Sequence, residues 1–455
     1  MYQSNYHIHF VGIGGIGMSG IAELLINLGY TVSGSDLKLS HITKRLEKKG
    51  AKIFQGHAKG QIKGADVIVT SSAISQENPE VIQAKQMVIP IIPRAEMLAE
   101  LMRIKYSIAI SGAHGKTSTT AMISQILNTA GLDPTVIIGG LLQGLDTNAL
   151  HGNGDFIVAE ADESDGSFLK YSPAIAAVTN IDLEHLDFYK DIEEIKDTFV
   201  KFINSVPFYG LAILCLDNPH IQDILPRIHV RYTTFGMSAQ SDLQARGISF
   251  HGGKSRFSVF HKDMDLGEIN LNIAGIHNIS NALAGIATGL ELKIPFVTIK
   301  KALEEIKGVK RRLEIKGEKK GILVMDDYGH HPTEIMATLT AVRESYPERR
   351  LIVVFQPHRY TRTQALFDDF TRAFYQSAIL IVLPIYAASE TAIEDVDSTV
   401  LCRGIKAHGH KDVSFAPDFT QALSIITHKA RKKDLVLTLG AGDIYTLGEQ
   451  LVEIL

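Results

Sequence analysis

The sequence predicts an α/β protein of three domains, each built on a mainly parallel sheet covered by helices. Apolar runs typical of strands alternate with amphipathic helical patterns along the whole chain, as in strand–helix–strand units. The chain has 455 residues, too many for one hydrophobic core. The strand-like runs are residues 7–11, 67–70, 107–110, 156–159, 174–179, 351–355 and 435–439.

Two boundaries divide the chain into residues 1–104, 105–310 and 311–455. Pro90 and Pro93, followed by a helical stretch to about Arg103, close the first domain before the next strand. A basic, polar stretch at residues 307–312 precedes the third domain. Between residues 247 and 268 the pattern changes to short alternating segments with glycines, which predicts antiparallel hairpins within the central domain.

The composition is that of an ordinary globular protein, with 45% hydrophobic and 21% charged residues. A formal charge of -4 gives no broad attraction to nucleic acid or an acidic membrane, so an anionic ligand must be held locally. Cys215 and Cys402 suggest neither a disulfide framework nor a cysteine zinc site. The most apolar stretch, residues 378–388, is too short to span a bilayer and predicts a buried strand. We expect a cytoplasmic monomer or weak homodimer without an export signal and without nucleic-acid or membrane partners.

A glycine-rich segment follows the first predicted strand directly and leads into a helical pattern. Its glycines are Gly12, Gly14, Gly15 and Gly17. A strand–glycine–helix sequence lets the backbone approach a pyrophosphate, whose charge is met by the helix N-terminus. Asp36 follows the next strand at about the distance where a dinucleotide fold places its ribose-binding acid. The pattern predicts a Rossmann-like domain that binds a nucleotide diphosphate, either NAD or a UDP compound; a purely structural tight turn is the alternative.

A second loop, residues 111–117, follows the strand at 107–110 and precedes another helical pattern. Its backbone N–H groups can cradle phosphates, Lys116 can reach the β and γ groups, and the Thr117 hydroxyl can bind magnesium. The loop is tighter than the common phosphate loop, because Ile110 rather than glycine stands five residues before Gly115. It predicts a central P-loop-type ATPase domain, with a polar helix start as the alternative. The predicted ATP contacts here are Gly112, Ala113, His114, Gly115, Lys116, Thr117 and Ser118.

Acidic residues follow two further strands. The acids after the strand at 156–159 are Glu160, Asp162, Glu163 and Asp165. The strand at 174–179 is followed by Asp182, Glu184, His185 and Asp187. The carboxyl ends of parallel strands open at the same edge of a sheet, so at least one carboxylate is expected to bind the magnesium. Taken singly, each acid would be a solvated loop residue, and His185 a structural hydrogen-bonding residue.

Further motifs complete a known pattern: Gly275-Ile-His277-Asn278 with Asn281, Arg311-Arg312, Asp326-Asp327, and the segments 327–332 (DYGHHP) and 356–362 (QPHRYTR). With the phosphate loop, Glu160 and His185, they make the chain resemble the Mur ligases over essentially its whole length. The glycine loop and the last two segments are similar to the member that joins L-alanine to UDP-N-acetylmuramate. The resemblance implies a ligase of peptidoglycan precursor synthesis, in which ATP phosphorylates the muramate carboxylate and the alanine amine attacks the acyl phosphate.

The resemblance also implies roles in catalysis and in ATP binding. Lys116 would hold the phosphates, Thr117 and Glu160 would bind one magnesium, and His185 would bind a second. Arg312 would lie near the phosphates, although a salt-bridge or hinge role is the plainer interpretation. Adenine and ribose would contact Asn278, Asn281 and Asp327.

The two other substrates would bind in the outer domains. The resemblance gives Gly14, Gly15, Gly17, Asp36, Ser71 and Ser72 to the UDP-sugar, and Tyr328, His330, His358, Arg359 and Arg362 to alanine in a Rossmann-like C-terminal domain. A guanidinium suits a carboxylate because it can form two parallel hydrogen bonds; structural stacking of the rings is the alternative. Sister ligases carry a carbamylated lysine about fifteen residues after the histidine, where this chain has Val200 and then Lys201. No carbamate is therefore assigned.

Three other functions remain open on the sequence alone. A ligase of the same architecture could attach murein tripeptide instead of alanine. A NAD-dependent oxidoreductase could use the glycine loop, although it would leave the phosphate loop unexplained. A nucleotide-binding switch would hydrolyse ATP without needing either substrate.

Overall fold

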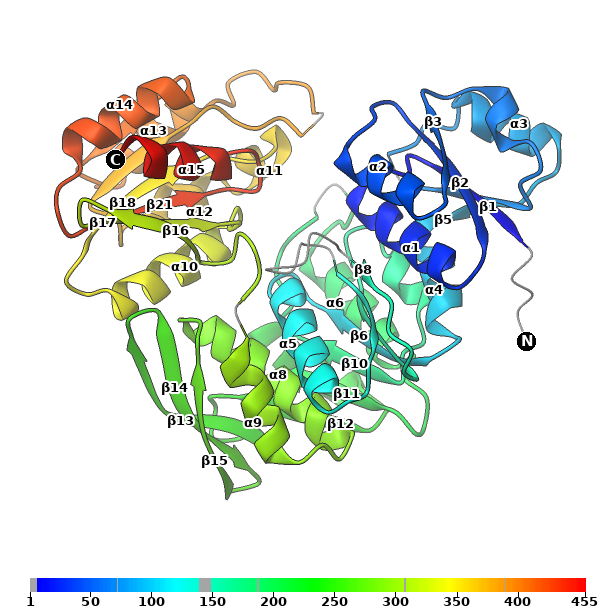
Figure 1. Ribbon diagram of the computed structural model, residues 1–455. Coiled ribbons are helices and arrows are strands. Elements are labelled where there is room, and N and C mark those ends of the chain that lie inside the picture. Colours follow the sequence, from blue (N-terminus) through cyan, green and yellow to red (C-terminus); the bar gives the residue numbers. More distant parts are fainter. Residues whose placement is uncertain (1–5, 72, 139–148, 186–187, 307, 389) are drawn as a thin grey trace. The chain divides into compact units, whose positions relative to one another are not determined.

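Three sheets organise the chain (Figure 1). The computed structural model describes residues 6–71, 73–138, 149–185, 188–306, 308–388 and 390–455. The chain forms two compact units. The first comprises residues 1–244, 261–264 and 281–303, and the second comprises residues 245–260, 265–280 and 304–455.

The N-terminal sheet has five strands in the order β3-β2-β1-β4-β5, and its pairs are parallel. The buried residues Phe10, Val11 and Ile68 lie on its central strands. Its strands are β1 (His7–Val11), β2 (Thr31–Asp36), β3 (Lys52–Gln55), β4 (Val67–Thr70) and β5 (Ile91–Pro93). The helices are α1 (Ile16–Asn27), α2 (His41–Lys48), α3 (Pro79–Gln86) and α4 (Arg94–Met102).

The central sheet has ten strands in the order β15-β14-β13-β12-β11-β10-β6-β9-β7-β8. Its strands are β6 (Tyr106–Ser111), β7 (Thr135–Ile137), β8 (Ala149–Leu150), β9 (Phe156–Glu160), β10 (Ile175–Val178), β11 (Leu211–Cys215), β12 (Tyr232–Gly236), β13 (Leu243–His251), β14 (Lys254–His261) and β15 (Met264–Leu271). The helices are α5 (Lys116–Thr129), α6 (Ile192–Ile203), α7 (Pro219–Ile224), α8 (Ile276–Glu291) and α9 (Phe296–Glu305). Strand β6 lies between β9 and β10 and pairs with both in parallel, so the segments after these three strands leave the sheet at one edge.

The C-terminal sheet has the order β16-β17-β21-β18-β19-β20, with β16 antiparallel to its neighbour. Its strands are β16 (Glu314–Lys319), β17 (Ile322–Asp327), β18 (Arg350–Phe355), β19 (Ile379–Val382), β20 (Val413–Phe415) and β21 (Asp434–Leu439). The helices are α10 (Pro332–Ser345), α11 (Tyr360–Ala365), α12 (Phe367–Arg372), α13 (Ser398–Ala407), α14 (Phe419–Lys429) and α15 (Tyr445–Ile454).

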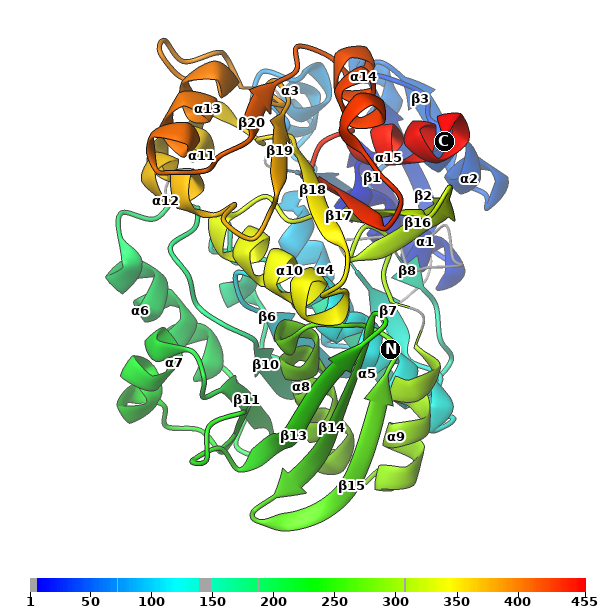
Figure 2. The ribbon, with the colours of Figure 1, turned by 90° about the vertical axis from the view of Figure 1, so that its left-hand side faces the viewer.

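Helices cover both faces of this C-terminal sheet. Alternate residues of β17 enter different cores: Leu323 and Met325 pack with residues of α10, α12 and α13, whereas Ile322 and Val324 pack with residues of α14 and α15. Figure 2 shows the strands between α10 on one side and α14 and α15 on the other. This doubly covered arrangement explains why the strands are continuous apolar runs.

The predicted fold class is confirmed, with three mainly parallel sheets and helices between their strands. The predicted strands 7–11 and 67–70 coincide with β1 and β4, and the segment predicted as hairpins forms β13, β14 and β15. The apolar stretch at 378–388 contains the buried strand β19, which ends before Pro384. The predicted boundaries at 104/105 and 310/311 fall between elements and stay predictions. Among the described residues, no helix combines the length and apolarity needed to cross a membrane.

Candidate active site

The phosphate loop is packed so closely that its glycines have no room for a side chain. Gly112 has φ +130°, and a Cβ there would lie 2.3 Å from Thr179 Oγ1 and 2.8 Å from the carbonyl oxygen of Asn180. Gly115 has φ +85° and caps the N-terminus of α5. Both conformations favour glycine. The backbone of the loop therefore turns directly into the helix, and a helix N-terminus of this kind favours an anion such as the predicted phosphate.

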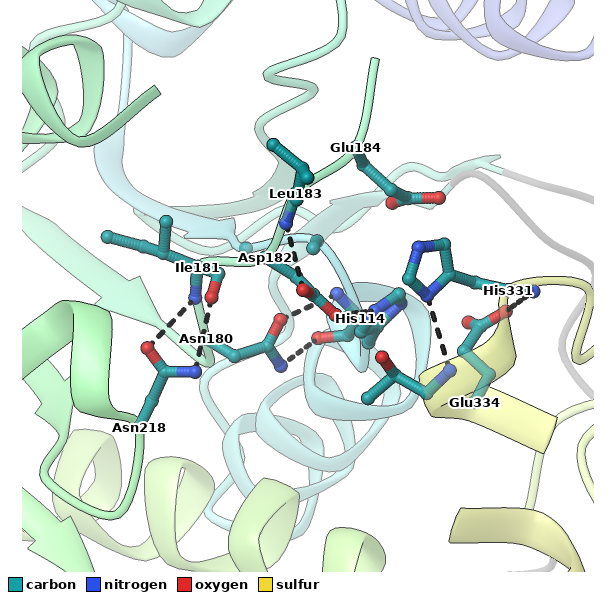
Figure 3. A network of polar contacts seen from close by, with 12 residues as sticks. His114, Asn180, Ile181, Asp182, Leu183, Glu184, Asn218, His331 and Glu334 are labelled. Atoms are coloured by element: carbon teal, nitrogen blue, oxygen red, sulfur yellow. Dashed lines mark hydrogen bonds and ion pairs between the residues drawn. The ribbon is translucent and has the colours of Figure 1, made fainter. Parts of the chain in front are cut away.

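The segment after β10 fixes the shape of this loop (Figure 3). The Asn180 side chain accepts a hydrogen bond from the backbone N–H of His114 at 2.9 Å and donates one to the backbone oxygen of the same residue at 2.9 Å. His114 Nε2 also lies 3.0 Å from Asp182 Oδ2. Asn218 in turn donates to the backbone oxygen of Ile181 at 3.2 Å. The loop is thus pre-formed by contacts with neighbouring segments.

Lys116, the first residue of α5, has its ammonium group folded back into the loop. Its Nζ donates to the backbone oxygens of Gly112 at 2.6 Å and Ala113 at 3.2 Å, and to Glu163 Oε1 at 2.7 Å. Burial alone would lower the pKa of Lys116, but the Glu163 carboxylate raises it above its usual value. Lys116 is therefore a permanent cation at the base of the loop.

A histidine and two glutamates lie together beside this lysine. His185 Nε2 is 3.7 Å from Glu163 Oε1 and 3.8 Å from Glu184 Oε2. One ligand atom from each of the three residues lies within 4.8 Å of the others. Burial opposes charge on the His185 ring, but Glu163 and Glu184 raise its pKa above the usual value. Two carboxylates and an imidazole form a donor set that fits a divalent cation.

The two predicted ligands of the first magnesium flank the same loop. Thr117 is in the first turn of α5, and Glu160 is the last residue of β9. Glu160 pairs in register with Ile110, directly before the loop. A hydroxyl and a carboxylate at adjacent strand and helix ends suit a hard cation.

The two predicted adenine contacts differ in their surroundings. Asn281, on α8, lies against the phosphate loop: a Cβ on Gly115 would come within 2.5 Å of its Oδ1. Asn278 Nδ2 donates to the backbone oxygen of Ala274, just before α8, at 2.7 Å, so part of its hydrogen-bonding capacity is used within its own segment. Both side chains are buried.

The N-terminal glycine loop is held by the end of β2. The backbone N–H groups of Gly12 and Ile13 donate to the oxygen of Ser35 at 2.8 and 3.0 Å, and that of Gly14 donates to Asp36 Oδ2 at 2.9 Å. Asp36 therefore shapes the loop itself. Of the predicted serines, Ser71 accepts a backbone hydrogen bond from Ile74 at 3.1 Å, and Ser72 lies outside the described residues.

An arginine at the start of α4 lies beside this glycine loop. A Cβ on Gly17 would come within 2.8 Å of the Arg94 guanidinium. The same guanidinium is 3.8 Å from Asp162 in the loop after β9. Arg94 thus places a positive charge next to the loop that is predicted to bind a diphosphate.

Two acidic residues end β17 in the C-terminal domain. Asp327 accepts hydrogen bonds from the backbone N–H groups of Leu313 and Gly329, both at 2.8 Å. Burial raises the pKa of Asp327 to about 6, although Arg312 and these N–H groups favour the carboxylate. Arg312 lies 3.5 Å from Glu334 and 5.1 Å from the ring centroid of Tyr328.

Four rings form a continuous row near the two predicted carboxylate-binding arginines. His330 contacts Tyr328 and His358 edge-on, with centroids 5.4 and 5.8 Å apart, and His358 stacks on Tyr386 at 5.6 Å with the rings 8° from parallel. Tyr328, His330 and His358 are half-buried, and Tyr386 is exposed.

The two arginines themselves come from the segment that follows β18. Arg362 Nη1 donates to the backbone oxygen of His358 at 3.3 Å, and Arg359 has the unusual φ of +70°. A non-glycine residue is strained at this φ, so the surrounding contacts must hold the backbone of Arg359 in place.

Comparison with protein-family models decides the family. The N-terminal part, residues 7–106, matches the Mur ligase family catalytic domain, residues 110–289 match the Mur ligase middle domain, and residues 311–442 match the Mur ligase glutamate ligase domain. The chain belongs to the Mur ligase family.

Relatives of this Mur ligase match it end to end. The UDP-N-acetylmuramate–L-alanine ligase of Desulforapulum autotrophicum is 71% identical over 455 residues, covering 100% of both chains, and that of Desulfatibacillum aliphaticivorans is 60% identical, covering 99% of both. A crystal structure of the UDP-N-acetylmuramate–alanine ligase from Thermotoga maritima matches with a TM-score of 0.82 and 29% identity over 98% of each chain. A murein peptide ligase from Psychrobacter arcticus shares the fold, with a TM-score of 0.71 at 24% identity over 99% of this chain and 98% of that one.

Several predicted site residues of this Mur ligase lie close together in the first unit. Lys116 and His185 lie around one carboxylate, that of Glu163, while Asn281 contacts the loop that carries Lys116. In the second unit, the predicted alanine residues Tyr328, His330, His358 and Arg362 form one continuous set of contacts. Roles for all of these residues stay predictions.

Several residues that shape the site were not singled out by the sequence. Asn180 carried no motif, and only its position directly after a predicted strand could have drawn attention to it. Arg94 carried no motif either and stood at the start of the predicted helical stretch after Pro93. His331, which had no predicted role, caps α10: its Nδ1 accepts a hydrogen bond from the N–H of Thr333 at 3.3 Å.

One pH-dependent property of the predicted alanine site of this Mur ligase can be measured directly. Burial, followed by the charges of His330, Arg362 and Arg359, lowers the pKa of His358 to about 3. His358 is therefore expected to stay neutral as the pH falls through 6.5, where an exposed histidine gains its proton. Its ring proton shifts, followed by NMR with His358→Gln for assignment, should be constant between pH 5 and 8. A midpoint near 6.5 would contradict the expectation.

Proposed function

We propose that this chain joins L-alanine to the carboxylate of UDP-N-acetylmuramate, with conversion of ATP to ADP and phosphate, in the synthesis of peptidoglycan precursors. The observation that carries the proposal is end-to-end similarity at 71% identity to a ligase of that name. The phosphate loop, with a half-buried lysine beside a set of side chains that fits a divalent cation, supports it independently. We also propose that the enzyme acts in the cytoplasm as a monomer or weak dimer.

The reaction needs ATP because a carboxylate is a poor electrophile at neutral pH. A muramate carboxylate oxygen attacks the γ-phosphorus, the bond to the β-phosphate oxygen breaks, and ADP leaves. The deprotonated amine of alanine then attacks the acyl carbon, and phosphate leaves with the former carboxylate oxygen. Phosphoryl transfer of this kind depends on positioning and charge neutralisation.

Residues of the central domain would supply both the positioning and the charge neutralisation. The N–H groups of the phosphate loop and the Lys116 ammonium would hold the β and γ phosphates, with Asn278 and Asn281 at the adenine. Magnesium, when bound, would screen the repulsion between the carboxylate and the phosphoryl group. Thr117 and Glu160 would hold one ion, and His185 would be a ligand of the second.

The outer domains would bind the two other substrates. The glycine loop, shaped by Asp36 and flanked by Arg94, would bind the diphosphate of the UDP-sugar. Arg359 and Arg362 would hold the alanine carboxylate, and the neutral His358 can accept a hydrogen bond from the amine without repelling it. Asp327 would bind the ribose of ATP, and Arg312 would lie near its phosphates.

A phosphate-release assay tests the proposal. With purified enzyme, ATP, magnesium and UDP-N-acetylmuramate, phosphate release is expected to depend strictly on L-alanine. Release that depends on murein tripeptide instead would favour the recycling ligase. Release without either substrate would favour a nucleotide switch, and a change in nicotinamide absorbance without ATP turnover would favour an oxidoreductase.

A further inference from the structure

Lys116 cannot bind a phosphate without giving up a partner. An ammonium group has three hydrogens, and those of Lys116 meet three acceptors, the backbone oxygens of Gly112 and Ala113 and Glu163 Oε1. Glu163 is the one charged acceptor, and it comes from a different segment, the loop after β9. A triphosphate that attracts Lys116 therefore competes directly with the Glu163 carboxylate.

The Glu163 carboxylate is buried, so loss of its contact with the Lys116 ammonium is unfavourable. Its side chain is 3% exposed, and among the residues that the structure describes, its Oε2 has no hydrogen-bond partner. A buried carboxylate without a compensating charge is strongly unfavourable. When the Lys116 ammonium moves away, another positive charge is therefore needed beside the Glu163 carboxylate.

The neighbouring loop provides the other ligands for such a charge. His185 and Glu184 lie beside Glu163, and one ligand atom from each of the three residues lies within 4.8 Å of the others. Both glutamates are buried, so few waters compete for their oxygens. The set is anionic, which suits a divalent cation and disfavours a phosphate oxygen as a direct ligand.

We propose that Glu163 changes partner when the nucleotide binds. It holds the Lys116 ammonium first; after the triphosphate has taken the lysine, it ligates a divalent cation together with Glu184 and His185. The inference rests on the proposed function, because it requires ATP as the ligand of the loop. It completes the second cation site with Glu163 and Glu184, in a chain that has Val200 at the spacing where sister ligases carry a carbamylated lysine.

The lysine half of the exchange is tested by ATP binding without metal. In isothermal titration calorimetry with EDTA, Glu163→Gln is expected to bind ATP at least about five-fold more tightly than the control Asp165→Asn, because Lys116 no longer leaves an anion to reach the phosphates. Asp165 is an exposed acid of the same loop, and its carboxylate accepts a hydrogen bond from Ser167 N–H at 3.0 Å. The control therefore removes one nearby negative charge without touching the lysine.

The metal half is tested by counting bound Mn²⁺ by electron paramagnetic resonance at saturating AMP-PNP. The wild-type protein should bind two ions. Glu163→Gln and Glu184→Gln should each weaken the second ion by roughly 10–100-fold and leave the first in place. Only Glu163→Gln should also tighten metal-free ATP binding, since Glu184 makes no hydrogen bond to Lys116 among the described contacts.

The outcomes separate this inference from the proposed function. Unchanged Mn²⁺ binding in Glu163→Gln, or metal-free ATP affinity equal to that of Asp165→Asn, would overturn the exchange while ATP binding by the wild type still supports the ligase. A wild type that binds no AMP-PNP would refute both. Thermal melting of each variant checks folding, and Glu163→Ala, which keeps the backbone oxygen that accepts from the Tyr189 hydroxyl, provides a second test.

Discussion

Replacement of Lys116 by alanine is expected to reduce the rate of ligation by about 10³-fold or more. Removal of a single donor that stabilises transition-state charge typically costs 10²–10³-fold in kcat, and Lys116 carries a full charge at the base of the loop. The same change leaves Glu163 buried without its ammonium partner, so metal and nucleotide binding should also be disturbed. Single-turnover formation of the acyl phosphate, measured by rapid quench, should show the loss directly.

Lys201→Ala is a matched control for this experiment. Lys201 is an exposed lysine of α6, next to the position where sister ligases carry a carbamylated lysine. Its removal is expected to leave ligation within about two-fold of the wild type, as is usual for exposed side chains away from a site. Near-normal turnover of Lys116→Ala would contradict the role of the loop, and a large loss in Lys201→Ala would reopen the question of a carbamate.

The fold could be predicted from the sequence because its strands are buried on both faces. A strand such as β4 or β10 is a short, almost continuous apolar run between polar turns, and parallel strands joined by helices repeat this pattern along the chain. Short strands carry less signal. Strand β8 has two residues, and its pairing with β7 depends on contacts that no local pattern encodes.

Some features of the candidate site could likewise be predicted from the sequence, and others could not. The two glycine-containing loops were predictable because a strand, a run of small residues and a helix are consecutive in the sequence. Glu163 was noticed as one acid among several, but its hydrogen bond to Lys116 joins residues 47 positions apart. Asn180 was missed because its contact with the phosphate loop depends on strand order: β10 lies beside β6 only in the folded sheet. Arg94 was missed because its contact with Gly17 joins helices α4 and α1, which are far apart in the sequence. A local sequence motif therefore predicts the kind of ligand that a loop can bind, whereas the order of the strands in the sheet determines which distant residues contact that loop.

Replacement of Arg359 by alanine is expected to lower kcat/KM for L-alanine by roughly 10–150-fold, mainly through KM. The estimate corresponds to about 1.5–3 kcal/mol for hydrogen bonds to a charged group, and the side chain is 42% exposed, which favours the lower half of the range. ATP affinity, measured by calorimetry, should change less than two-fold, because the guanidinium belongs to the segment after β18 and not to the phosphate loop.

Two further variants separate the charge of Arg359 from its backbone conformation. The residue has φ +70° and its N–H donates to the oxygen of Tyr386 at 2.9 Å, so any replacement retains a strained position. Arg359→Lys keeps the charge but loses the two-pronged geometry, and should recover only part of the affinity for alanine. Glu390→Gln removes the carboxylate 4.0 Å from the Arg359 guanidinium, and should not weaken alanine binding if Arg359 serves the substrate. Equal losses in alanine and ATP affinity across these variants would mean that the segment folds the domain and does not bind the amino acid.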